Sequence, residues 1–203
     1  MDVEEEIGRG EIWLVRHGET EWSASGRHTG RTDLPLNAEG RRQAEGLRGR
    51  LGGKSFALVL SSPLLRAAET CRLAGFGDAA KCDEGLREWD YGDYEGLTTE
   101  QIRGRAPGWT LWTGDPPHGE RIGDVAGRAQ RVIGRARGVK GDTVLFSHGH
   151  FLRVLAACWL GLPPDDGRFF ALGTASVGIL GYEREAPVIS LWNEACGAGR
   201  EKS

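Results

Sequence analysis

Apolar residues in this chain gather in short continuous runs, and longer stretches with apolar positions at helical spacing lie between them. Continuous apolar runs are typical of strands that are buried on both faces of a sheet. The pattern predicts strands at residues 11–16, 56–61, 79–82, 142–147, 175–182 and 187–192. We expect the last two to pair as a hairpin, because the segment between them is polar.

Helix signals fill the intervals between these strands. Asn37 can cap a helix that runs to Leu51, and Ser62 and Pro63 suit the N-cap and first position of the next helix. Further helices are expected at 120–137 and 149–160, short helices and loops at 98–119, and a long loop at 18–35. Strands that alternate with helices indicate an α/β sandwich with a mostly parallel sheet.

The length and composition suit one domain. A chain of 203 residues with 39% hydrophobic and 27% charged residues has the size and balance of a single globular unit, which we expect to span 1–203. Residues 1–10 are acidic and Gly-rich, so we expect this end to be frayed.

The net charge of −3 gives no reason to expect a nucleic-acid or membrane partner, so an anionic substrate would need a local basic pocket. No apolar run is long enough for a membrane span, and the acidic start differs from a signal peptide, which predicts a cytoplasmic protein. The scattered cysteines predict free thiols and no zinc site. They are Cys71, Cys82, Cys158 and Cys196.

Candidate chemistry lies where the predicted strands end. Arg16 and His17 leave one strand, Arg66 follows a second, and His148 follows a third. Ligands bind at the carboxyl ends of the strands in sheets of this kind, so we expect these four side chains to meet at one rim. Each of them, taken singly, has a plain structural or surface role as an alternative.

Arginine is suited to a phosphate monoester, because its fork matches phosphate geometry and stays charged. Backbone N–H groups at Gly149 and His150 could add a helix N-terminus to the anion site. A neutral imidazole at His17 can attack phosphorus and form phosphohistidine. The departing alkoxide needs a proton, for which Glu88 is the best placed carboxylic acid in the sequence.

Four motifs then resemble one family. They are Leu14-Val-Arg-His-Gly-Glu-Thr-Glu-Trp22, Ser61-Ser-Pro-Leu-Leu-Arg-Ala-Ala-Glu-Thr70, Leu86-Arg-Glu-Trp-Asp-Tyr-Gly-Asp-Tyr-Glu-Gly96 and Ser147-His-Gly-His-Phe-Leu-Arg153. In this order they resemble the histidine phosphatase superfamily, which includes the cofactor-dependent phosphoglycerate mutases. The resemblance extends from about residue 11 to residue 192.

The resemblance implies a three-layer α/β/α sandwich like that of phosphoglycerate mutase, with no metal and no cofactor. It implies that Arg16, Arg66 and His148 form a phosphate pocket around the nucleophile His17, with Glu88 as proton donor. The family's substrate contacts would fall on Thr20, Ser23, Thr29 and Gly30.

Within the family, the sequence favours hydrolysis over mutase activity. Family mutases have a long insertion with neighbouring arginines after the acid Glu, whereas only residues 89–147 separate Glu88 from His148 here, with no two adjacent arginines. The mutases have Asn where this chain has His150. The resemblance is closest to sedoheptulose-bisphosphatase-like enzymes and mutase-like acid phosphatases, which implies a small phosphorylated metabolite such as a sugar phosphate.

Other interpretations stay open at this point. Mutase activity and a catalytically weak phosphate-binding protein of the same fold are alternatives, and the substrate and a homo-oligomeric state are undecided. Gly52-Gly-Lys-Ser55 lacks the first glycine of a P-loop, because Arg48 stands there. The Arg-rich stretch 121–137 is interpreted as a solvated helix face.

Three further interpretations concern aromatic residues and histidines. The segment 98–119 is expected to border the site, with Trp109 and Trp112 more consistent with core than with sugar packing. His150 can be a substrate contact or a helix-terminus residue. His28 and His118 have weaker claims to a role in binding.

Overall fold

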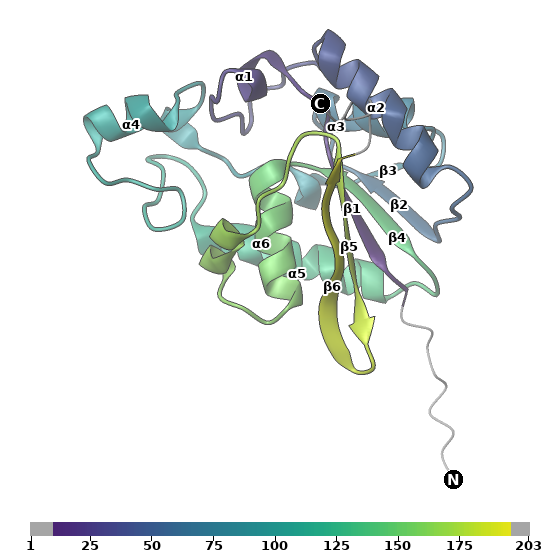
Figure 1. Cartoon of the computed structure of the whole chain (residues 1–203). Helices are drawn as coiled ribbons and strands as arrows, with labels where there is room; N and C mark the ends of the chain where they lie inside the picture. The colour runs from purple at the N-terminus through teal and green to yellow at the C-terminus, as the bar shows by residue number, and fades with distance from the viewer. Residues whose placement is uncertain (1–9, 196–203) are drawn as a thin grey trace, which may run out of the picture.

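The computed structural model describes residues 10–195, so Cys196 and most of the end expected to fray lie outside it. Its centre is one six-stranded sheet in the order β3-β2-β4-β1-β5-β6 (Figure 1). The strands are β1 (Ile12–Arg16), β2 (Leu58–Ser61), β3 (Lys81–Cys82), β4 (Thr143–Ser147), β5 (Ser176–Glu183) and β6 (Ala186–Ala195). All six predicted strands are therefore present, with ends shifted by a few residues.

The sheet is mixed, as predicted. Strands β1, β2, β3 and β4 are parallel to one another, whereas β5 runs antiparallel to β1 and pairs with β6 as a hairpin. In the β1–β4 pair, Arg16 lies opposite Ser147. This register brings the residues that follow, His17 and His148, to neighbouring positions at the carboxyl ends of two central strands.

Helices cover both faces of the sheet, which makes the predicted three-layer α/β/α sandwich (Figure 1). One face packs against α2 (Ala38–Leu51) and α3 (Leu65–Leu73), and the other against α5 (Ile122–Arg137) and α6 (Gly149–Trp159). Side chains of β1 pack in the core on both faces of the sheet, because alternate side chains of a strand point to opposite faces. Trp13 and Val15 belong to the core cluster that packs against α2 and α3, and Leu14 belongs to the cluster that packs against α5 and α6.

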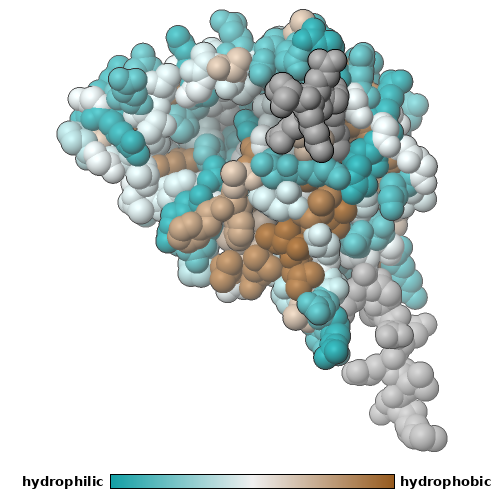
Figure 2. Space-filling model, viewed as in Figure 1, coloured by the Kyte–Doolittle hydropathy of each residue, from teal (hydrophilic) through white to brown (hydrophobic). Residues whose placement is uncertain are grey.

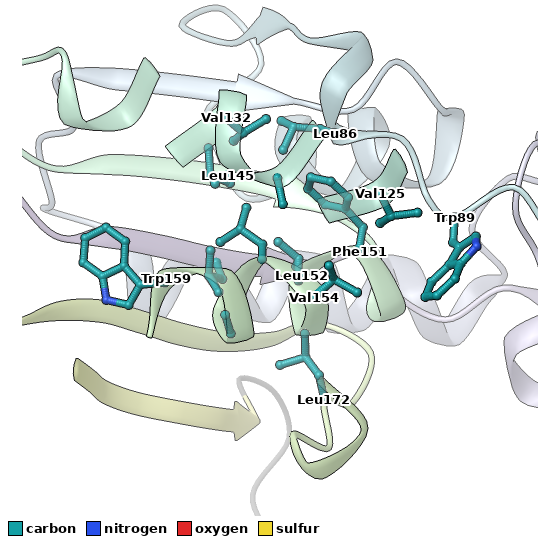
Figure 3. Close-up of a cluster of buried hydrophobic side chains, with 14 of the residues drawn as sticks. Leu86, Trp89, Val125, Val132, Leu145, Phe151, Leu152, Val154, Trp159 and Leu172 are labelled. Atoms are coloured by element: carbon teal, nitrogen blue, oxygen red, sulfur yellow. The ribbon is translucent and has the colours of Figure 1, made fainter. Parts of the chain in front are cut away.

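The larger core cluster joins α5 and α6 to the turn that carries Glu88. Figure 3 shows part of it, including Leu86 and Trp89 of that turn, Val125 of α5 and Phe151 of α6. Each of these four side chains is fully buried. Burial of this extent stabilises a side chain by about 1.5–3 kcal/mol relative to exposure, so the turn is held as part of the core.

Two helix boundaries and one loop differ from the prediction. Helix α3 begins at Leu65 with Leu64 as N-cap. The Ser62 hydroxyl lies 2.7 Å from His148 Nε2 and accepts from the Leu64 N–H, ahead of the helix. Helix α5 begins at Ile122 and not at residue 120. The expected loop 18–35 contains a short helix, α1 (Glu21–Ala24), which Thr20 caps. The prediction that Asn37 caps α2 is confirmed, since its side chain accepts from the Gly40 N–H.

The segment 98–119 contains the short helix α4 (Thr99–Arg105) followed by turns, as expected. It projects to one side of the sandwich (Figure 1). Trp109 is buried in the core, which confirms that interpretation, and Trp112 is half-buried against the same cluster. Three short 3₁₀ helices complete the elements, at Glu84–Leu86, Gly92–Tyr94 and Pro164–Phe169.

The surface combines polar helices with one apolar region. Figure 2 shows apolar surface over the area of α6 and the β5–β6 pair, and polar surface over α2. Leu162 and Phe169 are among the most exposed large apolar side chains, at 40% and 69%. Patches of this kind can mark protein interfaces, so homo-oligomer formation stays an expectation. None of the described helices is both long and apolar enough to cross a membrane.

Gly40 lets α2 approach the loop that follows His17. A Cβ atom at residue 40 would lie 2.0 Å from the Glu19 carbonyl oxygen, whereas a Cβ at Gly49 of the same helix meets nothing within 4 Å. We predict that Gly40→Ala lowers the free energy of unfolding by about 2–3 kcal/mol, because backbone must move. Gly49→Ala should raise it by up to about 1 kcal/mol.

Urea unfolding of the two variants and the wild type measures this difference. Equal stability of the two variants would contradict the close approach of α2 to the loop.

Candidate active site

A cavity of about 280 Å³ opens at the carboxyl ends of β1 and β4. Among the residues proposed from sequence, those that line it are Arg16, His17, Ser23, Thr29, Glu88, Gly149 and His150. The others lie close to this wall but do not line the cavity, and they are Thr20, Gly30, Arg66 and His148. The expected meeting of distant segments at one rim is therefore observed.

His17 ends β1 with a defined ring orientation. Its Nδ1 lies 2.7 Å from the carbonyl oxygen of Gly18. A carbonyl can only accept, so Nδ1 carries the proton and the neutral ring has its lone pair on Nε2. Burial, helped by the charges of Arg66 and Arg16, holds the pKa of His17 well below its ordinary value of 6.5. The ring is neutral near pH 7, and its Nε2 can act as a nucleophile.

Arg16 brings a cation to the same wall. Its Nη1 donates to the Leu172 carbonyl at 2.5 Å, and its Nε is buried with no hydrogen-bond partner. A Cβ at Gly149 would lie 3.2 Å from this Nε, so the glycine gives the guanidinium room beside the start of α6. Burial lowers the pKa of Arg16, while the neighbouring Glu88 opposes this change.

Arg66 lies in the first turn of α3, as predicted, but it is fully buried and does not reach the cavity surface. Its two terminal nitrogens donate to three backbone carbonyls of the preceding loop, those of Thr29, Gly30 and Thr32, at 2.9–3.1 Å. The loop that carries two proposed substrate contacts is thus tied to a cation. The Nε of Arg66 has no partner.

His148 sits beside His17, with ring centroids 5.2 Å apart. Its Nε2 is 2.7 Å from the Ser62 hydroxyl, and its Nδ1 is buried without a partner. Burial, and next the charge of Arg66, keep the pKa of His148 well below 6.5. Two neutral imidazoles and two guanidinium groups therefore share one small volume.

Within residues 10–195, three of the four unpartnered buried atoms lie at this point, and the fourth, on Thr143, lies at the opposite end of β4. Among the described residues, the buried side-chain nitrogens and oxygens with no hydrogen-bond partner are Arg16 Nε, Arg66 Nε, His148 Nδ1 and Thr143 Oγ1. Buried polar groups are satisfied in the large majority of cases, so a local cluster of exceptions is informative. Two of these are charge-bearing donors, and a bound anion is the ligand that would satisfy them.

Glu88, which lies between the two histidine motifs in the sequence, lines the same cavity. Its side chain is only 4% exposed, and one carboxylate oxygen accepts from the N–H groups of Trp89 and Phe151 at 2.9 and 2.8 Å. The other accepts from the His150 N–H at 3.0 Å. Glu88 is therefore fixed against the N-terminus of α6, beside the anion site.

Arg128 of α5 holds the turn that presents Glu88. Its guanidinium donates to the carbonyls of Gly85 and Arg87 and forms a two-fold ion pair with Glu120. Both side chains of this pair are largely buried. Glu120 therefore stabilises this contact and does not begin the helix, which corrects the predicted boundary.

The sequence matches the pattern of the histidine phosphatase superfamily (branch 1) over residues 12–195. The chain belongs to this superfamily. It is 45% identical to an acid phosphatase of Mycobacterium tuberculosis over 188 residues, which cover 89% of this chain and 92% of that protein. It is 36% identical to sedoheptulose 1,7-bisphosphatase of Saccharomyces cerevisiae over 185 residues, which cover 73% and 67%.

A solved structure of a Mycobacterium tuberculosis open reading frame superimposes with a TM-score of 0.87. Sequence identity to it is 40%, and the match covers 92% of this chain and 98% of that one. The histidine phosphatase fold predicted from the four motifs is thus confirmed.

The cavity of this histidine phosphatase is also lined by side chains that the sequence motifs did not single out as site residues. They are Arg27, His28, Tyr91, Thr99, Arg153 and Leu172. His28, for which the sequence gives only a weak indication of a binding role, lines the cavity. Tyr91 and Arg153 lie inside two of the four family motifs, so their place in the sequence could have indicated that they belong to the site. His118, in contrast, is exposed and contacts Asp93.

Two of the predicted substrate contacts, Thr20 and Gly30, are buried and support the loop instead of lining the cavity. Thr20 is fully buried, caps α1 and exchanges hydrogen bonds with Ser23. Gly30 is buried below the cavity surface, where a Cβ would lie 2.4 Å from the Trp89 carbonyl oxygen. Among residues 10–195, no group of three or more acidic, His or Cys side chains is arranged to hold a metal ion.

The buried imidazoles predict a pH dependence of stability. The pKa values of His17, His148 and His150 are all lowered by burial first, so these rings stay neutral in the folded protein while their unfolded forms take up protons below pH 6.5. The free energy of unfolding should therefore fall as pH decreases below 6.5, by up to about 1.4 kcal/mol per pH unit for each ring.

Urea unfolding between pH 7.5 and 5.5 measures this slope, and His17→Gln should make it shallower. A stability that is constant or rises on acidification through this window would contradict neutral buried rings.

Proposed function

We propose that this chain is a phosphomonoesterase that hydrolyses a small phosphorylated metabolite through a phosphohistidine on His17. One observation carries the proposal: a neutral imidazole with its free Nε2 lies at the wall of a cavity that the cation of Arg16 and the carboxyl group of Glu88 also line. The phosphatase names of the relatives support the same reaction class. We propose that residues 12–195 act as one catalytic domain.

In the first step, Nε2 of His17 attacks phosphorus in line with the ester oxygen. The N–P bond forms as the P–O ester bond breaks, and Glu88 in its protonated form gives its proton to the departing alkoxide. In the second step, water gives a proton to Glu88 and its oxygen attacks the phosphohistidine. The N–P bond breaks, inorganic phosphate leaves and Glu88 is protonated again.

Arg16 and the N–H group of Gly149 are suited to stabilise the phosphoryl oxygens in both steps. Most catalysis of phosphoryl transfer comes from such positioning and charge stabilisation. The His150 N–H, which the sequence also offered to the anion site, donates to Glu88 instead. In this proposal, Arg66 and His148 interact with the phosphoryl group from behind His17. They do so through two nitrogens that have no partner among the described residues, Nε of the arginine and Nδ1 of the histidine. Because the protein itself supplies the positive charge, we propose that no metal ion takes part.

The dimensions and lining of the cavity favour a small, oxygen-rich substrate. Its volume of about 280 Å³ is at the small end of ligand sites. Ser23, Thr29 and Thr99 bring hydroxyl groups to the lining, and Arg27 and Arg153 bring two more guanidinium groups. A sugar phosphate or a related metabolite fits this chemistry, in agreement with the sugar bisphosphatase among the relatives.

Removal of the nucleophile tests the proposal. We predict that His17→Ala lowers kcat for p-nitrophenyl phosphate at least about 10⁴-fold, because no other residue replaces the attacking nitrogen. His118→Ala, which changes an exposed histidine on the 98–119 segment, is the matched control and should retain wild-type kcat. Wild-type activity should also persist in EDTA. Turnover by His17→Ala near the wild-type rate, or a strict need for added Mg²⁺, would refute the mechanism.

A second prediction concerns the proton donor. Glu88→Gln should lower kcat for an alkyl phosphate by about 10²–10⁴-fold, since the alkoxide then leaves without a proton. The loss should be much smaller for p-nitrophenyl phosphate, whose phenolate leaves readily. Steady-state kinetics with both substrates provides the comparison, and equal losses for both would exclude Glu88 as the acid.

A further inference from the structure

Tyr91 and His150 form a hydrogen-bonded pair in the wall of the cavity. The Tyr91 hydroxyl lies 2.7 Å from Nδ1 of His150, and both residues line the cavity. The Tyr91 ring is otherwise buried. The His150 ring is also held by neighbours, with Trp112 edge-on at 5.6 Å and His28 stacked at 6.1 Å between ring centroids. The imidazole is therefore packed among aromatic neighbours.

The direction of this hydrogen bond follows from the donors present. Nδ1 of His150 is the one hydrogen-bond partner of the Tyr91 hydroxyl among the described residues. If Nδ1 carried the proton, the phenolic hydrogen would have no acceptor in the protein. We therefore assign the phenol as the donor to Nδ1, which leaves the proton of the neutral ring on Nε2.

The electrostatics of the pair agree with this assignment. Burial, and next the charge of Glu88, raise the pKa of Tyr91 well above 10, so the phenol keeps its proton. Burial, followed by the charges of Arg153 and His28, lowers the pKa of His150 well below 6.5, so the ring is neutral. Nε2 of His150 has no partner among the described residues, and it is available as an N–H donor at the cavity.

We propose that Tyr91 is a positioning residue that fixes His150 so that its Nε2–H donates to an oxygen on the organic part of the substrate. This inference rests on the proposed phosphatase function and specifies its substrate class: phosphates whose alcohol part has hydroxyl groups near the ester. The hydroxyls of Thr29 and Thr99 line the same cavity, and His28 Nε2 lies 3.2 Å from the Thr99 hydroxyl.

The pair can be separated experimentally from the proton donor. His150 holds Glu88 through its backbone N–H, at 3.0 Å from the carboxylate, so a side-chain substitution at residue 150 keeps that hydrogen bond. A substrate pair that differs only in hydroxyl groups then isolates recognition. Glycerol 3-phosphate and n-propyl phosphate have the same carbon number, and both release an alkoxide that needs the same proton.

The experiment measures kcat and KM of wild type, Tyr91→Phe, His150→Leu and the double variant with these two phosphates. In each single variant we expect the ratio of kcat/KM, glycerol phosphate over propyl phosphate, to fall about three- to tenfold, the effect of one neutral hydrogen bond. The change should lie mainly in KM for glycerol phosphate. In the double variant, Tyr91→Phe should add no further loss, because it acts through His150.

Two additional variants sharpen the comparison. His150→Gln, whose amide can donate from a similar position, should recover part of the ratio and should be insensitive to Tyr91→Phe. Tyr94→Phe removes a phenol that packs edge-on against Trp109, with ring centroids 5.1 Å apart, and should leave the ratio unchanged. Folding of every variant is checked by its urea unfolding midpoint.

The outcomes separate the inference from the proposed function. An unchanged ratio in Tyr91→Phe or in His150→Leu, or additive losses in the double variant, would overturn the inference while hydrolysis by the wild type persists. If the wild type releases phosphate from neither compound nor from p-nitrophenyl phosphate, the proposed function fails, and this inference fails with it.

Discussion

The hydrogen bond from His17 Nδ1 to the Gly18 carbonyl, 2.7 Å long, is the interaction on which the chemistry of the site depends. It fixes the tautomer, so the lone pair of the ring is on the nitrogen that is free to react. Burial and the two neighbouring guanidinium groups then keep the ring from taking a second proton. A protonated imidazole could not attack phosphorus, so the cations that would bind a phosphate also maintain the nucleophile.

Such an arrangement of buried cations is costly unless backbone and core support it. Arg66 is held by three carbonyls of the loop that follows α1, and Arg16 by the Leu172 carbonyl. The parallel register of β1 and β4 places His17 and His148 side by side. On the other side, Arg128 and the core around Trp89 hold the turn of Glu88. The fold thus supplies, from distant segments, both halves of the proposed reaction.

Much of this architecture could be predicted because it depends on local sequence. Continuous apolar runs marked the strands, and the carboxyl-end rule placed His17 and His148 together. The details that depend on tertiary partners could not be predicted in the same way. The Ser62 hydroxyl looked free to cap a helix, but it contacts His148, and Glu120 pairs with Arg128. The burial of Arg66 depends on loop carbonyls, which carry no side-chain signal in the sequence.

The central claim is that phosphorus becomes bonded to Nε2 of His17 during turnover. The most direct measurement mixes wild-type enzyme with ³²P-labelled substrate and stops the reaction rapidly without acid. The labelled peptide is then mapped by mass spectrometry. We predict a phosphoryl group on the peptide that contains His17, stable in base and lost in acid, and formed at a rate at least equal to kcat. Phosphate release with no labelled protein, or label on another residue, would contradict it.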